Sequence, residues 1–139
     1  MVKKYTLPCY ENIEQFLVLI HLSEAMLRNS KRVVTDGSHT WIFFSDLDEF
    51  IRCFPKVLFR SLGVVMDHSN SLELELLEVK FPGTNKYLGN LFVTSQRDFY
   101  KETIPFVCLE FTYDDLKQHN VANGGFDSNF SSNDNFNST

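Results

Sequence analysis

The chain has 139 residues and a formal net charge of −5, and hydrophobic residues occupy 43% of its positions. This mildly acidic balance argues against a dedicated nucleic-acid or anionic-membrane binder, because such proteins carry a surplus of Lys and Arg. The three cysteines are odd in number and far apart, which argues against a disulfide framework, a zinc knuckle or a redox pair. Unpaired cysteines fit a reducing compartment, so we expect a cytoplasmic protein.

The composition changes abruptly at Asn120. Residues 120–139 contain no Lys, Arg, Leu or Ile and consist mainly of Asn, Ser, Gly and Asp. So little apolar surface cannot offset the entropy of ordering the backbone, which is about 1–2 kcal/mol per residue. We therefore predict a single compact domain over residues 1–119 and a disordered tail over residues 120–139.

The first predicted element is a helix over residues 11–29 that is apolar on nearly all sides. One face has helical spacing and carries Ile13, Phe16, Leu17, Ile20 and Leu27. The opposite side carries a second apolar group, Val18, Leu19, Leu22 and Met26. A helix of this kind is either covered on two sides within its own domain or packed against a partner chain.

A β-hairpin is predicted next, over residues 31–44. Its turn is the pair Asp36-Gly37, which stands between a β-branched run and an aromatic run. This arrangement is among the strongest short-range hairpin signals, and it requires a positive φ at the glycine.

A second helix is predicted to begin at Ser45, whose hydroxyl group can cap it, and to end at Gly63. Phe50 and Phe54 are expected to be buried in its apolar stripe, and Pro55 is expected to kink it or start a new turn. Its opposite side would carry a cationic stripe with a spacing of four residues, formed by Arg52, Lys56 and Arg60.

The remaining chain has the pattern of antiparallel strands. Residues 72–81 alternate apolar and charged side chains with a change of phase in the middle, which predicts a bulge, and Gly89 marks a second one. Thr112 is expected to cap a short helix over residues 113–119. The predicted fold class is α+β, with two main helices packed on a mostly antiparallel sheet. The order is N-terminal helix, hairpin, helix, β-meander, short C-terminal helix and disordered tail.

No known motif for catalysis, phosphate binding or metal binding occurs in the sequence, so we expect no cofactor and no metal. No apolar run is long enough to span a membrane. These features favour a non-enzymatic intracellular interaction protein of the adaptor, chaperone-like or viral accessory type, which binds a protein partner or a second copy of itself. The side chains expected to make these contacts are apolar: Val18, Leu19, Leu22, Met26, Phe126, Phe130 and Phe136.

Two alternative functions remain open at this point. One is nucleic-acid binding through two basic clusters, made up of Arg28, Lys31, Arg32, Arg52, Lys56 and Arg60. Such residues are also typical of solvated helix faces and helix ends. The other alternative is a small enzyme whose Cys and His residues, distant in the sequence, meet in space.

Overall fold

The computed structural model describes residues 6–69, 71–83, 86–95 and 105–117. These residues form two main helices and six strands, followed by a short helix over residues 113–117. The elements are α1 (Ile13–Asn29), β1 (Val33–Thr35), β2 (Thr40–Phe44), α2 (Leu47–Cys53), β3 (Leu58–Asp67), β4 (Leu72–Lys80), β5 (Tyr87–Thr94) and β6 (Val107–Phe111).

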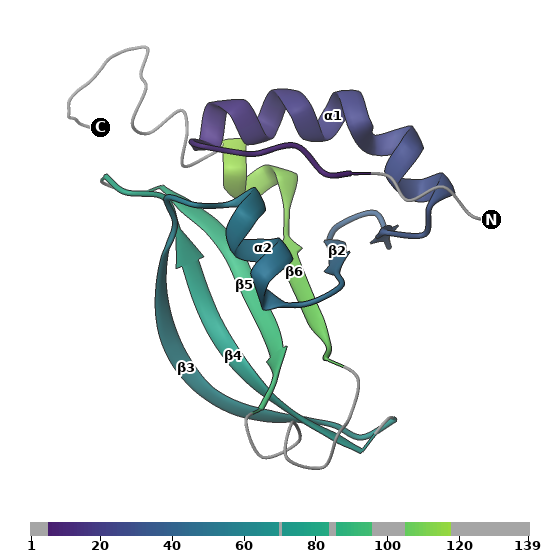
Figure 1. Ribbon diagram of the computed structural model, residues 1–139, viewed down its shortest axis with the longest axis vertical. Coiled ribbons are helices and arrows are strands. Elements are labelled where there is room, and N and C mark those ends of the chain that lie inside the picture. Colours follow the sequence, from purple (N-terminus) through teal and green to yellow (C-terminus); the bar gives the residue numbers. More distant parts are fainter. Residues whose placement is uncertain (1–5, 70, 84–85, 96–104, 118–139) are drawn as a thin grey trace.

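The six strands make one antiparallel sheet in the order β1-β2-β6-β5-β4-β3. β3 to β6 form a meander, and the β1-β2 hairpin joins it through β6. Figure 1 shows α1 lying across the top of the molecule, with α2 in front of the upper part of the sheet. In this view the lower halves of β3 and β4 extend beyond both helices. The predicted α+β class, with helices on a mostly antiparallel sheet, is confirmed.

The core between the helices and the sheet contains a group of aromatic rings in contact with one another. Phe50 and Phe54 stack with ring centroids 4.8 Å apart, and Tyr10 stacks on Phe54 at 5.0 Å. Phe16 of α1 meets Phe111 of β6 edge-on at 5.1 Å. These five rings have at most 2% of their surface exposed, so the predicted burial of Phe50 and Phe54 is confirmed. Such rings supply a large apolar area and fix their neighbours by geometry.

The first helix forms as predicted, beginning two residues later than expected. Asn12 is its N-cap, and the Asn12 side chain accepts a hydrogen bond of 2.8 Å from the backbone N–H of Gln15. This bond satisfies one of the N–H groups that have no partner inside the helix. The buried face contains Ile13, Phe16, Ile20, Ser23 and Leu27.

The predicted hairpin is also present, and Gly37 has the expected positive φ of 97°. Its connection is the four-residue loop from Asp36 to His39 rather than a two-residue turn, since Thr35 pairs directly with Thr40. The Asp36 carboxylate accepts the backbone N–H groups of Ser38 and His39 at 3.0 and 2.8 Å. These bonds close the loop and, with the Ser38 hydroxyl group and the charge of His39, hold the pKa of Asp36 below its usual value.

The predicted second helix is wrong in both of its bounds. Asp46, not Ser45, is the N-cap, because its carboxylate accepts the N–H of Glu49 at 2.8 Å. α2 ends at Cys53, and the chain that follows Pro55 becomes strand β3. Proline has no N–H to continue the helix and restricts the residue before it, so the helix stops. Leu58 and Leu62 are four residues apart, a spacing that also fits one face of a helix, but both lie in strand β3.

The predicted bulge in residues 72–81 is misplaced by one strand. β4 is continuous, and the extra residue lies opposite it in β3, between Ser61 and Gly63. The change of phase in β4 has another cause, because β4 buries side chains on both of its faces. Leu74 lies on one face and Val79 on the other, and both are at least 95% buried.

The irregularity predicted at Gly89 is confirmed, since the pairing of β5 with β4 shifts next to it. A Cβ atom on Gly89 would lie 2.2 Å from the backbone oxygen of Glu110 on β6. Glycine is therefore required here by the close approach of two strands.

Candidate interaction surface

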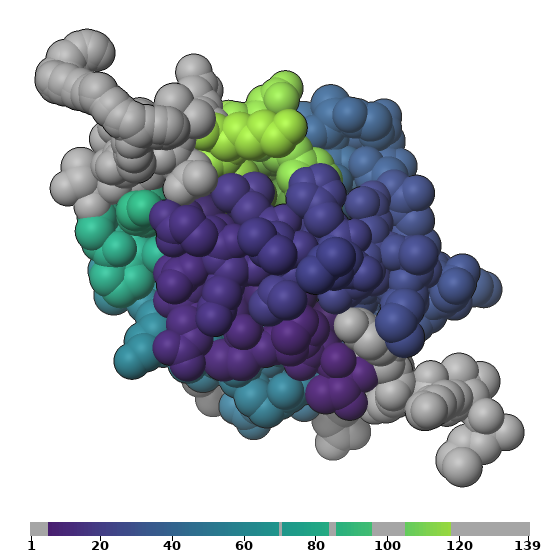
Figure 2. All heavy atoms as spheres, turned by 90° about the horizontal axis from the view of Figure 1, so that it is seen from above, coloured from purple at the N-terminus to yellow at the C-terminus, as the bar shows by residue number. Residues whose placement is uncertain are grey.

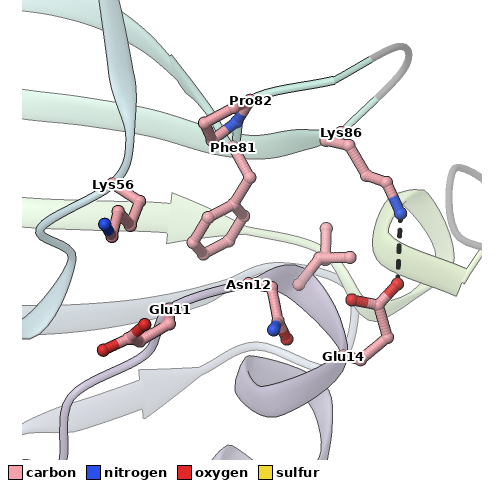
Figure 3. Close-up of a pocket in the computed structure, with 8 residues that line it drawn as sticks. Glu11, Asn12, Glu14, Lys56, Phe81, Pro82 and Lys86 are labelled. Carbon is pink, nitrogen blue, oxygen red and sulfur yellow. Dashed lines mark hydrogen bonds and ion pairs between the residues drawn. The ribbon is translucent and has the colours of Figure 1, made fainter.

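The described residues contain a hollow of about 290 Å³ beside the start of α1 (Figure 3). It is lined by Glu11, Asn12, Ile13, Glu14, Lys56, Phe81, Pro82 and Lys86. The Lys86 ammonium group and the Glu14 carboxylate pair across it at 3.1 Å. Burial raises the pKa of Glu14, but its backbone hydrogen bond and Lys86 outweigh this and lower the pKa overall. The charged residues that line the hollow are two lysines and two glutamates, so the lining has no net charge that would attract an ionic ligand.

Two of the cysteines are poorly suited to nucleophilic chemistry. Burial raises the pKa of the Cys53 thiol to about 11 and that of the Cys108 thiol to about 12. The reactive form of cysteine is the thiolate, which is scarce at neutral pH when the pKa is so high. Cys9 is the exposed one of the three.

No group of three His, Cys, Asp or Glu side chains that could hold a metal ion occurs in the part of the chain that the structure describes. Within the same residues, no helix has both the length and the apolar character needed to cross a membrane.

The basic residues expected on helix faces are placed quite differently. Arg52 lies on α2, Lys56 follows α2, and Arg60 lies on β3, so the predicted cationic stripe on one helix does not exist. Arg60 pairs with Glu78 of β4 at 3.0 Å, and Arg52 lies 3.7 Å from Glu49.

The second basic cluster, at the end of α1, is also largely neutralised. Arg28 forms an ion pair with Glu24 one helical turn earlier, and Arg32 forms one with Glu49 of α2. Arg32 is only 15% exposed and also donates to the Phe43 carbonyl group. Lys31, exposed, has a positive φ of 62° in the turn between α1 and β1. Paired arginines on separate elements are a weak basis for binding a phosphate backbone.

The outer side of α1 carries three exposed apolar side chains. Val18, Leu22 and Met26 are 60%, 74% and 54% exposed, and they lie four residues apart. Figure 2 shows α1 across this face of the molecule. Leu19, which was grouped with them, is half-buried and packs against the core. We call Val18, Leu22 and Met26 the α1 stripe.

A larger apolar surface occurs where the sequence pattern did not predict it, along β3. This strand is ten residues long and forms one edge of the sheet. Nine of its ten residues are exposed. Six of them are large apolar side chains that are 37–60% exposed, namely Leu58, Phe59, Leu62, Val64, Val65 and Met66. We call this strand the β3 edge.

The two faces of the β3 edge differ in their neighbours on β4. Phe59 and Val64 stand opposite Val79 and Glu75, on the face that carries the helices. Val65, opposite Leu74, lies on the other face. The edge therefore offers apolar side chains on both faces in addition to its backbone.

The sequence contained part of the signal for the β3 edge. The run Val64-Val65-Met66 begins with two β-branched residues and lies in the part of the chain expected to form strands. The length of this strand and its place at the edge depend on pairing that local patterns do not encode. The three tail residues Phe126, Phe130 and Phe136 lie outside the described residues.

Comparison with known proteins gives no match to a family model, to a curated protein or to a solved structure.

Proposed function

We propose that this chain is a non-enzymatic protein-interaction domain that binds by strand addition at the β3 edge. The observation that carries the proposal is a ten-residue edge strand with six exposed large apolar side chains. An edge strand presents a row of backbone N–H and C=O groups that can pair with an added strand. Backbone pairing supplies affinity, and alternating side chains supply specificity.

The contrast between the two edges of the sheet supports this proposal. β1, at the opposite edge, has only three residues. Proteins commonly protect an edge by making it short, by placing charges or proline on it, or by bulging it. The β3 edge is long and has no proline. Of these protective features, the β3 edge has only two charged residues, Arg60 and Asp67, and the bulge.

Strand addition can be tested with a labelled peptide that carries the sequence of residues 58–67. Fluorescence anisotropy should rise as the full chain is added, and a peptide of the same composition in scrambled order should bind much more weakly. The same titration with a Val65→Lys chain should show weaker binding, because the substitution places a charge on the edge. No binding, or equal binding of the scrambled peptide, would refute strand addition at β3.

A further inference from the structure

We propose that the strand added at the β3 edge is β3 of a second copy, antiparallel to the first and related to it by a two-fold axis at Gly63. This inference rests on the proposed function and names its partner. Two six-stranded sheets would then become one continuous sheet. Such a two-fold contact requires that the strand be complementary to itself.

The bulge creates part of that complementarity. Arg60 pairs with Glu78 and Asp67 pairs with Leu72, and these two β4 residues are six apart, so they share one face. In a regular strand, residues seven apart point to opposite faces. The extra residue, Leu62, changes the phase and places Arg60 and Asp67 on the same face.

A two-fold axis at Gly63 matches the two halves of the strand. Four residues before the bulge, Leu58–Ser61, meet the four after Gly63, Val64–Asp67, and every opposed pair shares a face. Phe59 lies opposite the partner's Met66, which is a favourable contact between sulfur and an aromatic ring. Gly63 has no side chain, and a Cβ atom built on it would meet nothing within 4 Å, so the edge is open at the axis.

Charges at the two ends of the β3 edge favour the antiparallel arrangement. Arg60 lies near the first end, and Lys80 of β4 stands opposite Leu58 there. Asp67 lies at the second end, and Glu73 of β4 stands opposite Met66. A two-fold axis brings each end beside the opposite end of the partner. Arg60, whose side chain is 71% exposed, then has the partner's Asp67 as a diagonal neighbour on the same face.

The area available also distinguishes the β3 edge from the α1 stripe. About half of the surface of the six large apolar side chains of the β3 edge is exposed, which amounts to on the order of 500 Å² over the two faces of the strand. Adding the backbone edge approaches the roughly 800 Å² per partner of a standard interface. The α1 stripe offers three side chains, and a helix satisfies its own backbone internally.

The test compares single substitutions on the two surfaces by sedimentation of the full chain across the micromolar range. In the proposed register Val65 faces the partner's Arg60, so Val65→Lys opposes like charges twice in each dimer. We expect the dissociation constant to rise by roughly tenfold. Val65→Glu, at the same position, faces the same arginine with the opposite charge and should weaken the dimer much less.

Val18→Lys on the α1 stripe is the matched control for a lysine on an exposed valine. It should leave the dissociation constant unchanged, and circular dichroism should confirm that all three variants are folded. A dimer that is disrupted by Val18→Lys and retained by Val65→Lys would overturn the proposal in favour of α1. Equal weakening by Val65→Lys and Val65→Glu would overturn the register at Gly63.

A wild-type chain that remains monomeric across the range would also overturn the second copy as the partner. The peptide titration then separates the two failures. A monomer that still binds the peptide of residues 58–67 retains strand addition and loses only the second copy, whereas a monomer that does not bind it loses both.

Discussion

At the scale of single residues, Arg32 holds three segments of the domain together. It follows α1 in the sequence, donates to the Phe43 carbonyl group of β2 at 3.0 and 3.2 Å, and forms an ion pair with Glu49 of α2. The Glu49 carboxylate also accepts the backbone N–H and the hydroxyl group of Ser45. A largely buried carboxylate with this many donors is stabilised in its charged form.

This arrangement predicts a specific pH dependence. Burial raises the pKa of Glu49, but the hydrogen bond and charge of Arg32, together with the Ser45 donors, outweigh burial and leave the pKa below its usual value of 4.5. A lowered pKa in the folded state contributes stability that is present above the unfolded pKa and is lost as the pH falls through the folded pKa. Glu49→Gln should therefore cost about 1–3 kcal/mol at neutral pH.

The difference between Glu49→Gln and the wild type should shrink as the pH falls below 4.5, which urea denaturation at several pH values would measure. Glu11→Gln is the control, because this glutamate is exposed. A free-energy difference that stays constant down to strongly acidic pH would show that the charge of Glu49 does not stabilise the fold.

At the scale of elements, α2 is short and depends on the core for its stability. It has only seven residues, fewer than an isolated helix needs in water, so tertiary packing must hold it. Phe50 makes the main contact, because its ring meets Phe44 of β2 at 5.1 Å and Phe54 at 4.8 Å.

Truncation of Phe50 to Ala should destabilise the domain by about 3–5 kcal/mol, because a fully buried ring is replaced by a cavity. Phe54→Ala should cost a similar amount. Phe59→Ala is the comparison, since this ring is 43% exposed on β3 and should lose less. Midpoints of urea denaturation give the ranking, and equal losses at Phe50 and Phe59 would contradict the described packing.

The elements also show how far the sequence could predict the fold. The first helix and the hairpin were predictable because their signals are local: apolar residues such as Ile13, Phe16 and Ile20 recur at helical spacing, and Gly37 permits a positive φ. The end of the second helix was missed because the leucines beyond Pro55 have a spacing that fits either structure. This segment forms a strand because it pairs with β4, and local sequence patterns do not encode that pairing.

The same distinction applies to the interaction surface. The α1 stripe could be recognised in the sequence because helical spacing identifies the side of a helix, and Val18, Leu22 and Met26 are indeed exposed. Its role in association remains a prediction. The β3 edge could not be recognised, since the order of strands in a sheet determines which one lies at the edge.

At the scale of the whole molecule, the two edges of the sheet differ in length by seven residues, ten in β3 against three in β1. Pairing of two β3 edges across a two-fold axis would leave the short β1 edges at the ends of the combined sheet. A short edge is a poor template for further strands. We therefore expect a closed dimer rather than a growing filament.

Hydrogen exchange of the β3 edge at low and high protein concentration is the most direct test of the central claim. If a second copy pairs with β3, backbone amides of residues 58–67 should exchange more slowly as the concentration rises, while those of α1 should be unaffected. Exchange in β3 that does not depend on concentration, or new protection confined to α1, would contradict the account.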